Sequence, residues 1–315
     1  MAQLVKLLDY ISRYENDLTR YPTQFIRLKK YQWDRMKIQW ESGLDHSAWQ
    51  QRPEEIEPEE ENKFAGMLKI FRRKNSVKEL EELIDTKEDD ENFGFEPNII
   101  YNPTSVAQLR KLYLDQLFHF QIKWASSTLM DKSRVDPKFI RDSLLRSFAL
   151  NLPDNYLLFY YPIIRLKSAS IDLEILIFTP VECMCISVIE DEDIAAFIGS
   201  GERFWLKKVG ESETKLLNPL IGLDRMEKVV SSIFNSKEID FPVRKYLISR
   251  NGYIDYPETS FNTQCVDRRS YKEWFAKLQK SSTPMKSNQF KAAQAVLDLG
   301  QTTAMSRLFE NEEEV

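Results

Sequence analysis

Apolar residues recur every three or four positions along much of the first part of the chain, which is the spacing of a helix that packs on one face. This spacing predicts helices over residues 3–19, 23–41 and 104–128. Their aromatic side chains suit packing between helices. We therefore expect three tryptophans of these helices to be largely buried, namely Trp33, Trp40 and Trp124.

Two stretches between these helices lack any pattern that forms a core. Residues 50–62 and 85–98 are strongly acidic, and acidic runs of this kind are typical of solvated linkers. Together the helices and linkers predict a helical N-terminal region over residues 1–135.

Beyond this region the pattern changes to short apolar runs, typical of strands, that alternate with helical segments. Helices are expected at 139–150, 218–234 and 265–278, and strands at 156–164, 203–209 and 243–249. Two more apolar runs, 172–179 and 183–189, flank a Thr179-Pro180 turn signal and predict a β-hairpin. The alternation predicts an α/β fold over residues 136–279. Residues 280–315 are expected to form a flexible or partner-bound tail with a short amphipathic helix.

The composition narrows the functional class. The chain has 9 glycines against 13 prolines and no glycine-rich phosphate-binding motif, which argues against the common nucleotide-binding folds. Its histidines, His46 and His119, have no partner at ligand spacing, so a zinc site is not expected. No run approaches the ~18 apolar residues of a membrane span, and no signal peptide is evident. We therefore expect a cytoplasmic protein that does not contact membranes.

The predicted hairpin carries acidic residues on an otherwise apolar face. In strand alternation Asp172 and Glu174 share one face, and a further acidic run begins at Glu190. If the two strands pair symmetrically about Val181, Asp172 faces Glu190. Facing carboxylates repel each other unless a cation, a proton or a fraying strand end relieves them. Two interpretations remain open here: an edge strand with its acids in water, or a site for a divalent metal.

The order of motifs around the hairpin has a counterpart in a known family. Leu152-Pro153-Asp154-Asn155-Tyr156 is followed by Ile175-Leu176-Ile177-Phe178-Thr179-Pro180, by Cys185-Ile186-Ser187-Val188-Ile189, by Trp205 and by Asn218-Pro219. In this order the chain resembles the nuclease-related (NERD) domain of the PD-(D/E)xK nuclease superfamily, over roughly 40% of its length. The resemblance implies a restriction-endonuclease-like core, a central mixed sheet with flanking helices.

The residues that carry the family's chemistry are poorly matched. The family's helix glutamate falls on Asp142 and its strand aspartate on Glu174, so both remain carboxylates. Without a gap, however, the glutamate and lysine of its E-x-K motif fall on Ser187 and Ile189, and a later glutamine falls on Gly222. The family's chemistry needs clustered carboxylates to hold Mg²⁺ and a lysine to place the attacking water. In this register Glu174 and Ser187 are expected on neighbouring strands, and the resemblance implies a nuclease-like domain without hydrolytic activity and without a cofactor.

A slipped register gives the alternative hypothesis. If residues 189–193 overlay the E-x-K motif, Asp172, Glu174 and Glu190 become candidate ligands of Mg²⁺, and Glu192 stands where the lysine belongs. The protein is then an active Mg²⁺-dependent nuclease that uses Asp142 together with these acids.

In the inactive interpretation the domain is a binding or scaffold module for nucleic acid or for a nucleic-acid-processing protein. The basic residues that would contact nucleic acid are Arg203, Lys207, Lys208, Arg244, Lys245 and Arg250. A third interpretation, an acidic protein–protein adaptor, rests on the helical region and the net charge of −5.

Overall fold

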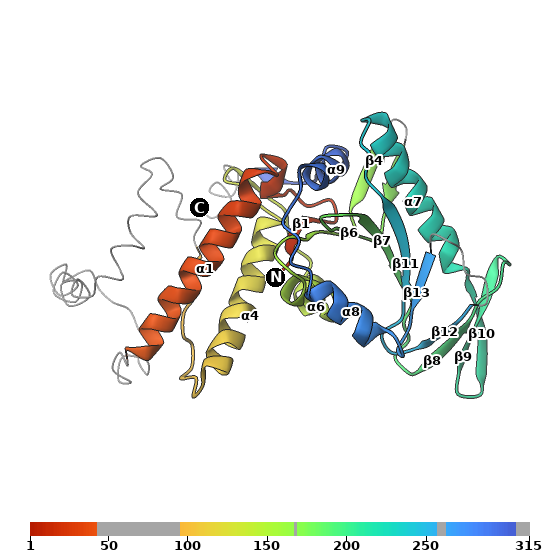
Figure 1. The fold of residues 1–315 in the computed structure, drawn as a ribbon, viewed down its shortest axis with the longest axis horizontal. Helices are drawn as coiled ribbons and strands as arrows, with labels where there is room; N and C mark the ends of the chain where they lie inside the picture. The colour runs from red at the N-terminus through yellow and green to blue at the C-terminus, as the bar shows by residue number, and fades with distance from the viewer. Residues whose placement is uncertain (43–94, 167–168, 257–262, 307–315) are drawn as a thin grey trace, which may run out of the picture. The chain divides into compact units, whose positions relative to one another are not determined.

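The computed structural model describes residues 1–42, 95–166, 169–256 and 263–306 (Figure 1). The chain divides into two compact units, residues 1–28 with 114–315, and residues 29–113. The predicted linker at 50–62 and most of that at 85–98 lie outside the described residues. The predicted helical region ended at residue 135, but neither unit begins or ends there. The first residues of the chain belong to the same unit as the sheet.

A six-stranded mixed sheet is the centre of the larger unit. Its strands are β1 (Gln3–Leu7), β3 (Leu157–Tyr160), β6 (Ile175–Phe178), β7 (Cys183–Val188), β11 (Val243–Ile248) and β13 (Thr263–Val266), in the order β1-β3-β6-β7-β11-β13. The three central strands β3, β6 and β7 pair antiparallel, whereas β1 joins β3 and β11 joins β7 in parallel. The predicted α/β fold, with a mixed sheet flanked by helices, is confirmed.

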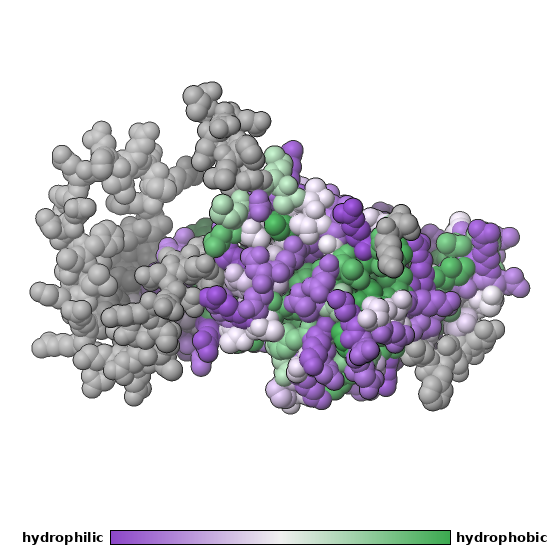
Figure 2. Space-filling model, turned by 90° about the horizontal axis from the view of Figure 1, so that it is seen from above, coloured by the Kyte–Doolittle hydropathy of each residue, from purple (hydrophilic) through white to green (hydrophobic). Residues whose placement is uncertain are grey.

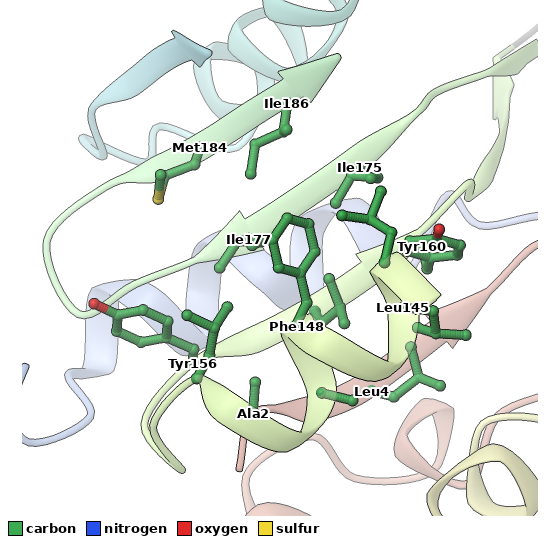
Figure 3. Close-up of a cluster of buried hydrophobic side chains, with 14 of the residues drawn as sticks. Ala2, Leu4, Leu145, Phe148, Tyr156, Tyr160, Ile175, Ile177, Met184 and Ile186 are labelled. Atoms are coloured by element: carbon green, nitrogen blue, oxygen red, sulfur yellow. The ribbon is translucent and has the colours of Figure 1, made fainter. Parts of the chain in front are cut away.

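Helices cover both faces of this sheet (Figure 1). The helices are α5 (Lys138–Arg141), α6 (Ser143–Asn151), α7 (Pro219–Ser236), α8 (Tyr271–Gln279) and α9 (Ser287–Leu297). Phe148 of α6 packs into a buried cluster with Ile177 and Met184 of the sheet (Figure 3). On the opposite face Phe178 contacts Phe234 of α7, with ring centroids 6.4 Å apart. Neighbouring strand residues point to opposite faces, so one short strand supplies both halves of the core.

The helix predicted over residues 3–19 is wrong. This segment forms strand β1, with all five residues buried, and a short 3-10 helix at Arg13–Glu15. Lys6 lies within the strand, where its ammonium group donates to Tyr10 O at 2.7 Å and contacts Glu15 Oε1 at 2.5 Å. A strand that is buried on both faces has no alternating pattern. Its apolar residues therefore matched helical spacing by coincidence.

The helices predicted at 23–41 and 104–128 are confirmed as α1 (Arg20–Glu41) and α4 (Val106–Trp124). Trp124 is buried as expected, within an aromatic cluster that includes Phe25. Trp33 and Trp40 are only half-buried. No helix among the described residues has both the length and the apolar character needed to cross a membrane.

Smaller sheets extend the unit. A four-stranded sheet has the order β10-β9-β8-β12, with β8 (Ala195–Ile198), β9 (Phe204–Val209), β10 (Ser212–Leu217) and β12 (Tyr253–Asp255). Two-stranded sheets pair β4 (Ile163–Leu166) with β5 (Ala169–Asp172), and β2 (Asp131–Lys132) with β14 (Met305–Ser306).

The C-terminal segment contains the predicted short helix, α9, but it is not the flexible tail that the sequence suggested. Helix α9 packs against α7 and β6, and its Gln289 is fully buried. The side chain of Gln289 donates to Asn155 O at 2.6 Å and to Phe178 O at 2.9 Å. Up to residue 306, therefore, the described part of this segment belongs to the fold, and the rest lies outside the described residues.

Candidate functional site

The hairpin of β6 and β7 places Glu174 and Ser187 side by side, the two residues that fall at metal-ligand positions in the resemblance described above. Ile175 pairs with Ile186 across the hairpin, which leaves Glu174 opposite Ser187. The Ser187 hydroxyl donates to Glu174 Oε1 at 2.8 Å, and the backbone N–H of Val188 donates to Oε2 at 3.3 Å. The predicted neighbourhood of Glu174 and Ser187 is thus confirmed.

Burial is the main influence on the charge of Glu174. Desolvation raises the pKa of this carboxyl above its usual value, and the hydrogen bonds from Ser187 and Val188 offset only part of that rise. Helix α7 lies over this carboxyl at Gly222. A methyl group added at that glycine would be 4.0 Å from Glu174 Oε1. Glu174, Ser187 and Gly222 are three of the positions matched to the family's site. They converge, but a hydroxyl and a glycine stand where the family has a carboxylate and an amide.

Asp142 is used by the fold itself. It is the N-cap of α6, where Oδ1 accepts from the backbone N–H groups of Leu144 at 2.9 Å and Leu145 at 3.0 Å. Its other oxygen accepts a hydrogen bond of 2.6 Å from the Tyr160 hydroxyl. Burial, reinforced by this bond to Asp142, raises the pKa of Tyr160 and keeps the hydroxyl protonated. Both carboxylate oxygens of Asp142 therefore have partners within the protein.

Glu190 is likewise engaged, by Arg250. The guanidinium makes a bidentate contact, Nε to Oε1 at 2.6 Å and Nη2 to Oε2 at 2.7 Å, and the backbone N–H of Arg250 adds a bond of 2.9 Å. This hydrogen bonding raises the pKa of Arg250. Arg250 also reaches Ser143 Oγ at 3.4 Å, at the start of α6. The pair therefore ties the end of β7 to the segment that carries Asp142.

The expected opposition of Asp172 and Glu190 is wrong. Asp172 pairs with Ile163 in the small β4–β5 sheet instead of continuing β6. The chain leaves the main sheet at Leu173, whose N–H donates to Pro162 O at 3.0 Å. The slipped register, which needs Glu190 beside Glu174, is not the one observed, and Glu192 is exposed. Among the described residues, no three histidine, cysteine or carboxylate side chains are grouped to hold a metal ion.

A cavity of about 730 Å³ opens beside Asp142, within the size range of small-ligand sites. Its walls include Leu8, Lys138, Phe139, Arg141, Asp142, Tyr161, Ile163, Asp172 and Leu173. Tyr161 has a left-handed backbone with φ of 52°, a conformation that costs a side-chain-bearing residue about 1–3 kcal/mol and is common at functional sites. Burial, and then the charges of Glu174, Asp142 and Glu190, raise the pKa of Tyr161. Tyr161 could not be predicted from the sequence, because nothing in the local pattern indicates a positive φ.

Most of the six basic residues proposed for nucleic-acid contact are engaged in ion pairs, and the six do not all lie on one face. Five of them make ion pairs: Lys207 with Asp191, Lys208 with Glu213, Arg244 with Glu182, Lys245 with Asp224 and Arg250 with Glu190. Lys207 and Lys208 are neighbours on β9 and so point to opposite faces. Arg203 lies over the ring of Phe204, with its Cζ 5.6 Å from the ring centroid.

Comparison with known proteins gives one short similarity. No family model matches the chain, and no solved structure matches it. The RNA 2',3'-cyclic phosphodiesterase of Geobacillus stearothermophilus is 49% identical to the chain over 55 residues. The similar stretch covers 18% of this chain and 18% of that protein, so the chain shares a segment with it over less than a fifth of either length.

Proposed function

We propose that the protein is a nuclease-related domain that binds nucleic acid without cleaving it. The observation that carries this proposal is the hydrogen bond from Ser187 to Glu174. Ser187 lies where the resemblance would require a second carboxylate to bind the metal. Mg²⁺ requires near-ideal octahedral coordination, usually with one or two protein carboxylates that are free to bind it. Here Asp142 caps a helix and Glu190 is held by Arg250. The carboxylates of Asp142 and Glu190 are therefore already engaged within the fold and are not free to bind a metal ion.

Two features favour nucleic acid as the ligand. The order of elements from α6 to β11 resembles a family of nucleases, and a segment of the chain is similar to a protein named for an RNA cyclic phosphodiester. Beside Asp142, the 730 Å³ cavity has Lys138 and Arg141 in its wall, and cations of this kind attract phosphate. We place the protein in the cytoplasm on sequence grounds alone.

Phosphodiester hydrolysis is the second candidate. The raised pKa of Glu174 favours it, because carboxyls with raised pKa values often serve as general acids or bases. The similarity to the cyclic phosphodiesterase also points in this direction.

Cleavage and binding assays on the full chain separate the two candidates. We expect no cleavage of RNA, DNA or a 2',3'-cyclic mononucleotide with Mg²⁺ or Mn²⁺, together with measurable binding of labelled RNA or DNA. The control variant is Glu273→Ala, whose exposed carboxylate pairs with Lys277 one turn along α8. Cleavage that is lost in Glu174→Gln and retained in Glu273→Ala would refute the inactive interpretation. Absence of binding to every nucleic acid would refute the binding role.

A further inference from the structure

The four-stranded sheet has one buried and one exposed face. Trp205 of β9, Phe197 of β8 and Ile254 of β12 are buried on one face. The strand register puts the neighbouring residues of these strands on the opposite face, which we name the outer face. The outer face includes Ile198, Phe204, Leu206, Leu217 and Tyr253.

Large apolar side chains of the outer face are exposed to solvent. Phe204 is 50% exposed and its cross-strand partner Leu217 is 54% exposed, while Leu206 and Tyr253 are 37% and 36% exposed. Single exposed apolar residues are ordinary on protein surfaces, but these lie on adjoining strands of one face. On the side where Figure 1 shows β9 and β10, Figure 2 shows hydrophobic residues at the surface beside hydrophilic ones.

Arginines accompany both aromatic rings of the outer face. The Arg203 guanidinium lies over Phe204 at 5.6 Å from the ring centroid. Arg268 and Arg269 lie 6.0 and 5.6 Å from the centroid of Tyr253. Arg269 is paired with Asp267, and the exposed Lys215 lies on the same face opposite Leu206. The same register also puts two carboxylates on this face, Glu213, which is paired with Lys208, and the exposed Asp255. The face thus combines exposed rings and cations beside them with a smaller number of carboxylates.

We propose that the outer face binds single-stranded nucleic acid, with bases stacked on Phe204 and Tyr253 and phosphates beside Arg203 and Arg268. This proposal rests on the proposed function and names where the strand lies. Sequence-tolerant single-strand sites combine aromatic rings that stack on bases with cations that follow the backbone. From strand spacing and rise, the two rings are about 16 Å apart, a span of a few nucleotides. The bases of a duplex are already stacked and paired, so the face should favour single strands.

A second copy of the chain fits this face less well. Two copies related by a two-fold axis would bring the same patch against itself. Arg203 and Arg268 of one copy would then approach the same cations of the other, and like charges that face each other across an interface weaken it. The polyanionic backbone of a nucleic acid complements these cations instead.

Binding measured by fluorescence anisotropy tests the proposal. The probes are a labelled oligouridylate of about 15 nucleotides, a length that spans one small site, and a duplex of the same length. In Phe204→Ala and Tyr253→Ala we expect the dissociation constant for the single strand to rise about tenfold, the usual effect of losing one stacked base. Phe204→Leu, which keeps an apolar side chain but no ring, should behave like Phe204→Ala. The control is Tyr101→Ala, which removes a ring that is 50% exposed in the other unit.

Each outcome decides the proposal. Photo-crosslinking of the oligouridylate followed by mass spectrometry should identify peptides that contain Phe204 or Tyr253. If the wild type binds the single strand but these variants bind equally well and crosslink elsewhere, the outer face is refuted while the proposed function stands. If the wild type binds no nucleic acid, both fail. If the variants instead abolish concentration-dependent self-association, the face is a protein interface and the proposal is wrong.

Discussion

Replacing Ser187 with glutamate tests the central geometry of the candidate site. Ser187 is buried, and its Oγ lies 2.8 Å from Glu174 Oε1, so a glutamate there places two carboxylates against each other. At a separation of 4 Å and an effective dielectric constant of 20, two unit charges repel by about 4 kcal/mol. Loss of the Ser187 hydrogen bond adds roughly 1 kcal/mol. Uptake of a shared proton limits the cost, and we expect Ser187→Glu to lose about 2–4 kcal/mol of unfolding free energy at pH 8.

Divalent cations should restore part of this loss. Two facing carboxylates supply part of the coordination shell that Mg²⁺ or Mn²⁺ needs. A cation that binds only the folded state raises the stability of that state. At a concentration 100 times its dissociation constant, the cation contributes about 2.7 kcal/mol. We therefore expect Mn²⁺ to raise the melting temperature of Ser187→Glu but not that of the wild type.

Thermal unfolding with Mn²⁺ or with EDTA, at acid and at neutral to basic pH, provides the measurement. The matched control is Ser187→Ala, which loses the hydrogen bond but adds no charge, and should lose about 1 kcal/mol with no response to metal. The reasoning is refuted if Ser187→Glu is as stable as the wild type at pH 8 and does not respond to Mn²⁺.

Three further perturbations test the electrostatics. Burial raises the folded pKa of Glu174 above its ordinary 4.5. The contribution of this carboxyl to the unfolding free energy is therefore complete below pH 4.5 and is lost as pH rises through the folded pKa. Urea unfolding of Glu174→Gln across this pH range should show no such loss of unfolding free energy. Glu15→Gln leaves the Lys6 ammonium buried without a carboxylate and should cost about 3 kcal/mol, whereas Lys6→Met should cost less; equal losses in urea unfolding would contradict this. Arg250→Ala leaves Glu190 without its bidentate partner and should cost about 2 kcal/mol in the same assay; a loss within error would count against the pairing.

Local chemistry explains which parts of the fold could be predicted from the sequence. The neighbourhood of Glu174 and Ser187 followed from the gapless spacing around Pro180, because strand side chains alternate with a fixed period and a short turn leaves little freedom. The observed pairs, such as Ile175 with Ile186, are displaced by one residue from a hairpin that is symmetric about Val181. Helix α7 was indicated by Asn218-Pro219, since the Asn218 side chain accepts from Leu220 N and Pro219 fits the first turn. Strand β1 was missed because its identity depends on a partner far along the chain.

The candidate site was less predictable for the same reason. The pairing of Glu190 with Arg250 joins residues 60 positions apart, and no sequence spacing indicates it. Asp142 has the right residue type for a metal ligand, but its carboxylate is used by the N–H groups of the following helix. Sequence showed where carboxylates stand, and the structure showed which groups already bind them.

The position of β1 at the edge of the main sheet has a consequence for how the chain folds. The hairpins β6–β7 and β9–β10 close over short loops and can form early, whereas Gln3 must find Leu157, about 150 residues later. Until β1 pairs with β3, the backbone groups of β1 have no hydrogen-bond partners in the sheet. Its side chains, which are buried in the folded protein, remain exposed to other chains. A fragment that begins near residue 136 would leave the free edge of β3 uncovered, so it should aggregate more readily than the full chain.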